Sequence, residues 1–193
     1  MFQKLFIVLA ILATTAAARA ESAEAVFAGG CFWCMESEYQ ELSGVSDVVS
    51  GFTGGTVKNP SYSGNHKGHY EAVKVTYDPD VVSYETLLNK YWLSIDPFDN
   101  RGQFCDKGPS YRAAVFTSND KEKTLALASL EKVKKQFPKQ EVYTEVLDAN
   151  DFWPVEEYHQ DYYVKNPVRY KYYRWNCGRD QRLEDIWGEA AKH

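Results

Sequence analysis

The order of apolar patterns along the chain is the feature that most restricts its fold. Short runs rich in small, β-branched and aromatic residues predict strands, and apolar residues three and four positions apart predict helices. From residue 25 to residue 147 these segments follow the order strand, helix, strand, strand, helix, strand, helix, strand. They lie at 25–30, 31–42, 45–52, 71–77, 83–95, 112–117, 120–136 and 141–147. This order predicts an α+β fold, a two-layer βαββαβ (ferredoxin-like) sandwich with an added αβ unit.

The chain after residue 149 shows neither period. It is rich in aromatic residues, and six of the 14 tyrosines lie between Tyr158 and Tyr173. We expect this segment to be an irregular C-terminal wrap around the sheet. Because the length suits one hydrophobic core, residues 21–193 are predicted to form a single domain.

Residues 1–20 have the composition of a secretory signal peptide. Lys4 precedes an apolar run that extends from Leu5 to Ala18, and small residues surround Arg19 up to Ala20. This pattern predicts export and cleavage after Ala20. An uncleaved anchor is the alternative, but the run is shorter than the roughly 20 residues of a membrane span. We therefore expect an exported protein, periplasmic if bacterial, with no stable membrane anchor.

The composition excludes several classes of protein. Cleavage would remove two basic residues and change the net charge from −5 to −7, which argues against nucleic-acid binding. Hydrophobic residues at 44% and charged residues at 25% are globular values, so disordered and fibrous classes are excluded. We expect a monomer.

The four cysteines are too few for a disulfide-dense scaffold, and a chain this long can build its core without one. They are Cys31, Cys34, Cys105 and Cys177. No second Cys-x-x-Cys and no histidine pair has the spacing of a zinc site, so we expect no bound metal. Chemical roles for the cysteines are therefore the alternative to structural ones.

The segment 29–34 (GGCFWC) places Cys31 between a predicted strand and the first turn of a predicted helix. Free N–H groups and the helix dipole stabilise a thiolate there and lower its pKa, which predicts a nucleophile. A buried, inert Cys31 is the alternative. Phe32 and Trp33 are bulky and apolar, so they predict a slot for a methyl or thioether group. The pair with Cys34 is also typical of thiol-disulfide oxidoreductases.

Five motifs in order give the chain a family resemblance. They are GCFW at 30–33, NPSY at 59–62, GHYE at 68–71, QFCDKGPSYR at 103–112 and YHQDY at 158–162. With these motifs the chain resembles the A-type peptide methionine sulfoxide reductase family from about residue 25 to Trp187. The resemblance implies thiol-dependent reduction of methionine S-sulfoxide, free and in proteins, and hence repair of oxidative damage.

The resemblance also implies roles for individual residues. Cys31 would attack the sulfoxide sulfur, and Glu71 would donate a proton to the departing oxygen. Tyr62 and Tyr111 would hydrogen-bond that oxygen, and Asp106 would help to order the site. Phe32 and Trp33 would hold the substrate methyl group. Partial burial would raise the pKa of Glu71 and keep a proton on it near neutrality.

The recycling of Cys31 depends on a second thiol. Attack leaves a sulfenic acid on Cys31, which condenses with another cysteine to a disulfide. Cys177 is a candidate because family members commonly use cysteines near the C-terminus, and Cys34 is a candidate because helical spacing brings it close to Cys31. Cys105 is expected to be structural. An external thioredoxin-like dithiol would then reduce the disulfide, with no bound cofactor.

Two other hypotheses remain at this stage. A thiol-disulfide oxidoreductase would use Cys31 and Cys34, and an aromatic-rich binding module would recognise oxidised or apolar side chains without turnover. The four histidines do not favour either, because His69 and His159 fall in the motifs above and are expected to form structural hydrogen bonds. His66 is a loop residue, and His193 is the last residue of the chain.

Overall fold

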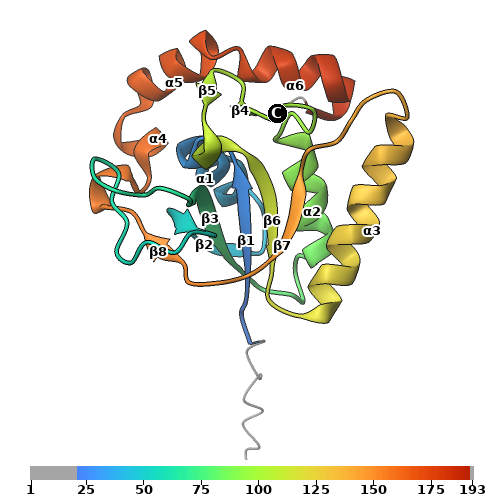
Figure 1. The fold of residues 1–193 in the computed structure, drawn as a ribbon, viewed down its shortest axis with the longest axis horizontal. Helices are drawn as coiled ribbons and strands as arrows, with labels where there is room; N and C mark the ends of the chain where they lie inside the picture. The colour runs from blue at the N-terminus through green and yellow to red at the C-terminus, as the bar shows by residue number, and fades with distance from the viewer. Residues whose placement is uncertain (1–20, 192–193) are drawn as a thin grey trace, which may run out of the picture.

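A six-stranded sheet forms the centre of the molecule in the computed structural model, which describes residues 21–191 (Figure 1). Its strands are, in spatial order, β7 (Glu145–Asp148), β6 (Ala113–Thr117), β1 (Ala23–Gly29), β3 (Tyr70–Tyr77), β2 (Val45–Thr53) and β8 (Trp153–Pro154). Neighbouring strands are antiparallel except β6 and β7, which are parallel. The inner order β6-β1-β3-β2 is that of a βαββαβ sandwich, so the predicted fold class is confirmed.

Three helices cover one face of this sheet: α1 (Phe32–Gln40), α2 (Tyr84–Leu93) and α3 (Asp120–Gln136). The two-residue period of a strand decides which side chains face them. On β1, Ala25 and Phe27 pack in the helix-facing core, whereas Ala28 belongs to a smaller cluster that includes Ala72 and Ala114. Helix α3 and strand β7 form the expected αβ unit at the sheet edge.

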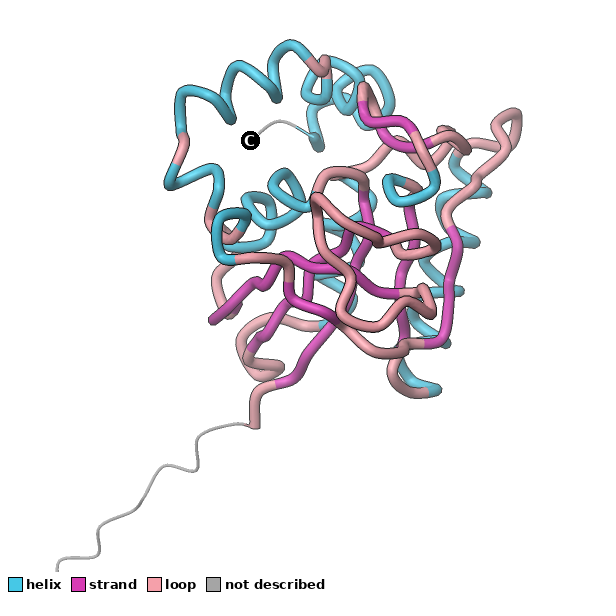
Figure 2. The backbone as a smooth tube through the Cα atoms, turned by 60° about the vertical axis from the view of Figure 1, so that its left-hand side comes forward, coloured by secondary structure: helices cyan, strands magenta, loops and turns pink. Residues whose placement is uncertain are grey.

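The last part of the chain is helical, so the prediction of an irregular segment was wrong. It contains η2 (Glu157–His159), α4 (Tyr162–Lys165), α5 (Pro167–Asn176), α6 (Arg179–Trp187) and η3 (Gly188–Ala191). Helices α5 and α6 bury only Tyr170, Arg179 and Leu183, so they lack the apolar period that identifies a helix in a sequence. Residues 162–191, called the C-terminal arm below, do wrap the domain and lie across the end of the sheet where β1 meets α1 (Figures 1 and 2).

A disulfide between Cys105 and Cys177 attaches the C-terminal arm to the loop between α2 and β6. That loop contains β4 (Gly102–Gln103), β5 (Asp106–Lys107) and η1 (Pro109–Tyr111). The bond crosses 72 residues of sequence. The expectation that Cys105 has a structural role agrees with this bond, but its partner is Cys177, which the sequence suggested as a thiol for Cys31.

Removal of this disulfide is expected to destabilise the fold. C105S opens a long covalent loop, and the entropy gained by the unfolded chain lowers the free energy of unfolding by about 2–4 kcal/mol. Urea titration without reductant measures the change. Dithiothreitol should lower the midpoint of the parent protein and leave that of C105S unchanged. A parent midpoint that is insensitive to reductant contradicts a stabilising disulfide.

Among residues 21–191, no helix is both long and apolar enough to cross a bilayer. The predicted signal peptide, residues 1–20, lies outside the described residues, as does His193.

Candidate active site

The turn that carries Cys31 is shaped by two glycines. Strand β1 ends at Gly29, and Gly30 has a φ of 84°, in the left-handed region that glycine tolerates. A Cβ atom on Gly30 would lie 2.6 Å from the Cβ of Gln103, so no larger residue fits. Cys31 then occupies the N-cap position of α1, as predicted from the sequence.

Cys31 and Cys34 are the free cysteines of the described chain, and both are buried. Their side chains share a hydrogen bond. Burial raises the pKa of Cys31 well above its usual value, so the expected lowering by the helix terminus is wrong for the closed site. The hydrogen bond from Cys31 lowers the pKa of Cys34 to about 7. The pair can therefore lose one proton near neutrality, and the hydrogen bond between the two sulfurs shares the resulting charge.

Glu71 lies beside this pair because of its position on β3. Glu71, Val73 and Val75 occupy every second position of β3, so they share the face that packs against α1. The Glu71 side chain is buried, with 2% of its surface exposed. Its Oε2 accepts a hydrogen bond of 3.2 Å from the N–H of Phe32, the residue after Cys31. Burial raises the pKa of Glu71 to about 8, so the carboxyl carries a proton at neutral pH, as expected from the sequence.

Tyr62 and Tyr111 complete the predicted group. The hydroxyl of Tyr111 is hydrogen-bonded to the Glu71 carboxyl and to the hydroxyl of Tyr62. Burial raises the pKa of Tyr62 to about 12 and also raises that of Tyr111, so both remain hydrogen-bond donors. The structure thus brings together the thiol, the proton donor and the two hydroxyl groups.

Tyr173 of α5 is a site residue that the sequence reasoning missed. Its hydroxyl donates to the Asp106 carboxylate and also hydrogen-bonds the Cys31 thiol. Asp106, predicted to order the site, has a pKa raised by burial, and its Oδ2 lies 3.9 Å from the Sγ of Cys177. Tyr173 stands four residues before Cys177, so on a helix the two side chains share one face. This spacing was the sequence feature that could have placed Tyr173 near the cysteines.

The aromatic slot is present, but side chains of the protein fill it. Phe32 has no exposed surface, and its ring centroid lies 6.0 Å from that of Tyr62 and 5.7 Å from that of His159. Trp33 stacks on Tyr162 of the C-terminal arm, with ring centroids 3.7 Å apart. The predicted slot between Phe32 and Trp33 is therefore closed by Tyr162, a long-range contact that the sequence pattern does not encode.

The three histidines of residues 21–191 make structural contacts. His69 is held by the Val57 carbonyl at 2.9 Å and by the Gly55 N–H at 3.3 Å, as a structural role requires. His159 packs 4.1 Å from the ring of Tyr62, centroid to centroid, although its Nδ1 has no hydrogen-bond partner. His66 stacks on Phe52.

One group in the described part of the chain has the spacing of metal ligands: the Cys105 and Cys177 sulfurs and an Asp106 oxygen lie within 4.8 Å of one another. The disulfide removes both thiolates from such a role.

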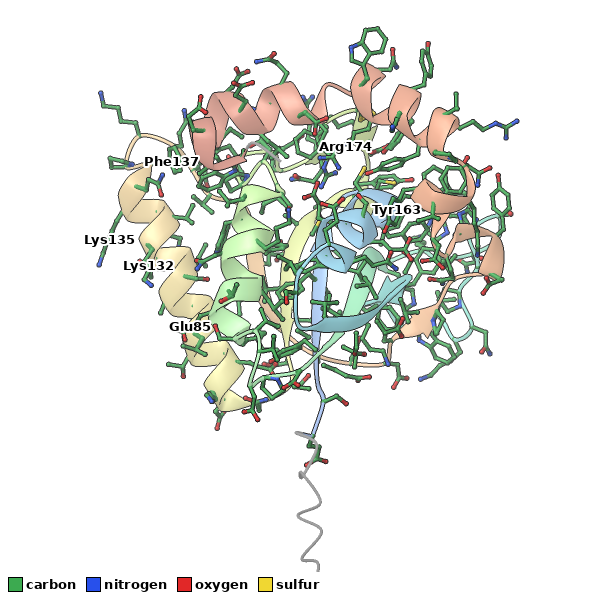
Figure 3. All side chains as sticks on the ribbon, turned by 180° about the vertical axis from the view of Figure 1, so that it is seen from behind. Glu85, Lys132, Lys135, Phe137, Tyr163 and Arg174 are labelled. Carbon is green, nitrogen blue, oxygen red and sulfur yellow. A yellow bond between two sulfur atoms is a disulfide. The ribbon has the colours of Figure 1, made fainter. Side chains whose placement is uncertain are left out.

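A separate cavity of about 560 Å³ lies between α1 and the C-terminal arm. Its lining includes Ser37 and Glu38 of α1 and Tyr170 of the arm. Tyr163 and Arg174 of the arm, which Figure 3 labels, also line it. Ser37 Oγ and the Tyr170 hydroxyl are 2.7 Å apart, and Tyr170 hydrogen-bonds Cys34. Tyr170 therefore links the lining of this cavity to the thiol pair, and neither the two cysteines nor Glu71 are among the lining residues.

A buried thiol pair next to a protonated carboxyl and two hydroxyl donors defines a thiol-dependent oxidoreductase that can protonate an oxygen on its substrate. Comparison with known proteins identifies the class. The sequence model of the family described as peptide methionine sulfoxide reductase matches residues 23–191. The chain belongs to this family, in its A type, and is an enzyme that reduces methionine sulfoxide in peptides, so the resemblance is confirmed.

Individual relatives agree. Peptide methionine sulfoxide reductase MsrA 2 of Caulobacter vibrioides is 48% identical over 185 residues, which cover 93% of this chain and 94% of that protein. The structure of methionine sulfoxide reductase A of Corynebacterium diphtheriae is similar, with a TM-score of 0.69, 30% identity and 81% of each chain covered. Yeast Mxr1, solved in complex with Trx2, shares the fold with a TM-score of 0.53, 19% identity and coverage of 73% of this chain and 84% of its own.

Proposed function

We propose that Cys31 is the nucleophile of methionine S-sulfoxide reduction, on free methionine sulfoxide and in proteins, and that Glu71 is its proton donor. The observation that carries this assignment is the protonated Glu71 carboxyl, which is hydrogen-bonded to the N–H of Phe32 beside Cys31. The Cys31 thiol gives its proton to the Cys34 thiolate, and its sulfur attacks the sulfoxide sulfur while Glu71 protonates the oxygen. Tyr62 and Tyr111 donate hydrogen bonds to that oxygen. The bond between the two sulfurs then breaks as the hydroxyl group passes to Cys31, so methionine leaves and Cys31 is left as a sulfenic acid.

The resolving thiol in this proposal is Cys34. Its sulfur already contacts Cys31, and its pKa of about 7 supplies a thiolate. It attacks the Cys31 sulfenic acid, the disulfide forms, and water leaves with the hydroxyl oxygen. Cys177 can take this role only after its bond to Cys105 is reduced.

One turnover without reductant separates the two candidates. Protein with an intact Cys105–Cys177 bond is mixed with one equivalent of methionine S-sulfoxide, digested and analysed by mass spectrometry. We expect a peptide pair linked through Cys31 and Cys34, and about one methionine per enzyme. A Cys31–Cys177 link, or a stable sulfenic acid on Cys31, contradicts Cys34 as the resolving residue. C34S is the matched control, in which the sulfenic acid should persist.

A thioredoxin-like dithiol protein completes the proposed cycle. It reduces the Cys31–Cys34 disulfide and is itself oxidised. The yeast Mxr1 structure with Trx2 supports a donor of this class. Steady-state turnover with thioredoxin in place of dithiothreitol tests it.

Export is proposed on the composition of residues 1–20, and the disulfide suits an oxidising compartment such as a bacterial periplasm. The N-terminal sequence of the protein recovered from cells tests cleavage after Ala20. The mature chain is proposed to act as a monomer without a membrane anchor and without nucleic acid, and its molar mass in solution tests the first of these.

A further inference from the structure

Arg179 is the largest fully buried side chain of the described residues, with 1% of its surface exposed. It is the first residue of α6 and follows Cys177 by two positions. Its Nη2 donates to the Ser94 carbonyl at 2.7 Å and to the Gly29 carbonyl at 3.2 Å. The C-terminal arm thus inserts a guanidinium into the interior of the domain.

The charge of this guanidinium has no direct anionic partner. Within residues 21–191, no carboxylate oxygen lies within 4.0 Å of Arg179, and its Nε lacks a hydrogen-bond partner. The ring of Phe104 lies 4.5 Å away and compensates part of the charge. A buried cation is costly unless an anion balances it, so the surroundings must supply one.

Several groups around this guanidinium belong to the turn that carries the thiols. Nη2 lies 3.4 Å from the Sδ of Met35, the residue after Cys34. A Cβ atom on Gly30, next to Cys31, would lie 3.8 Å from Nη1. The guanidinium therefore lies close to the residues before Cys31 and to the residue after Cys34. In this segment the two thiols are the buried groups that can become an anion near neutral pH.

We propose that Arg179 is a positioning residue that supplies the counter-charge for the thiolate of the Cys31–Cys34 pair. This inference rests on the proposed function of the two cysteines and adds a residue that acts on them through space. The pKa of Cys34 is lowered first by the hydrogen bond from Cys31, and the charge of Arg179 is the next contribution that lowers it.

Other charged and titratable groups face the pair, and none replaces Arg179. Arg174 of α5 also lowers the pKa of Cys34, though less than Arg179 does, and it binds the carboxylates of Glu38 at 2.7 Å and Asp180 at 2.6 Å and lines the open cavity. Glu71 of β3 is protonated up to a pH of about 8.

The remaining groups around the pair are acids. They are Asp106 of β5, Tyr170 and Tyr173 of α5, Tyr62 and Tyr111. The Asp106 carboxylate competes with the thiolate for the positive charge of Arg179. Burial raises the pKa of Asp106, and the charge of Arg179 opposes that rise.

The test compares R179Q and R179K with R182Q. Arg182 lies on the same helix and donates to Asp96 at 2.7 Å, but its side chain is 45% exposed and far less enclosed, so it is the matched control. The rate of iodoacetamide alkylation at Cys31 and Cys34 is measured against pH, with the Cys105–Cys177 bond intact and the sites located by peptide mass. Thermal melting establishes that each variant is folded.

We expect the alkylation midpoint of R179Q to rise by about one pH unit or more, which is a tenfold slower reaction at pH 6. R179K should stay within about half a unit of the parent, and R182Q should match it. A folded R179Q with the parental midpoint overturns the proposal, and so does an R179K that shifts as far as R179Q.

If R179Q does not fold, R179K decides: the parental midpoint supports a counter-charge, and a shift of a unit contradicts it. Because alkylation needs no sulfoxide, failure here is distinguishable from failure of the proposed reductase roles.

Discussion

C31S is expected to abolish the reduction of a methionine sulfoxide peptide, with a loss of about 1,000-fold or more. A serine hydroxyl at the N-cap of α1 keeps the geometry of the turn, but its oxygen is a far weaker nucleophile than sulfur and cannot take up the substrate oxygen as a sulfenic acid. Loss of the sulfoxide, followed by mass spectrometry with dithiothreitol as reductant, measures the effect.

C34S is the control that isolates the first step. It retains Cys31 and Glu71, so it should release about one methionine per enzyme in a single turnover even where recycling is slow. Multiple turnovers by C31S would contradict the assignment of the nucleophile. A C34S variant that releases no methionine would show that Cys34 is needed before the sulfenic acid forms.

E71Q is expected to lower the rate by about 100- to 1,000-fold, because glutamine accepts the Phe32 N–H but has no acidic proton to give. In the parent protein, activity should fall as the pH rises through about 8, where the Glu71 carboxyl loses its proton. The rate of a single turnover against pH measures both. E85Q, an exposed change on α2, is the control and should follow the parent profile (Figure 3). A parental rate in E71Q excludes Glu71 as the proton donor.

The same substitution is expected to stabilise the protein at alkaline pH. The folded-state pKa of Glu71 is raised from 4.5 to about 8, so the folded protein holds a proton that the unfolded chain releases between these values. Stability contributed by that proton is present below pH 4.5 and is lost as the pH rises to about 8. E71Q has no such loss, and urea titrations should find it more stable than the parent at pH 8.5 and similar at pH 4.5. Equal stability at both pH values contradicts a raised pKa.

The local sequence pattern was sufficient to predict the sheet, its three covering helices and the position of Cys31 at the start of α1. Glu71 stands two positions before Val73 and four before Val75, so the two-residue period of a strand places its carboxyl on the same helix-covered face. This period is visible in the sequence alone. The cysteine after Gly30 caps α1 for equally local reasons.

The contributions of the C-terminal arm depend on long-range contacts that local pattern does not encode. Tyr162 covers Trp33, Tyr173 bonds Asp106, and Cys177 pairs with Cys105, each from a polar helix without an apolar period. Tyr162 and Tyr170 of this arm pack with Cys31 and Cys34, so these contacts contribute to the burial that raises the pKa of Cys31. Sequence reasoning therefore placed the thiols and the carboxyl of the candidate site and missed the residues that enclose them.

The central position of β1 has a consequence for the order of synthesis. This strand pairs with β3 on one side and with β6 on the other, and β6 ends only at Thr117. A growing chain that already contains Cys31 and Cys34 must lengthen as far as Thr117, by about half of the domain, before β1 has both neighbours, and by more before Tyr173 and Arg179 are added. Until then the two cysteines are ordinary exposed thiols of an unfolded segment. The reactive pair is thus a property that the chain acquires at the end of its synthesis, although its residues are among the first to be made.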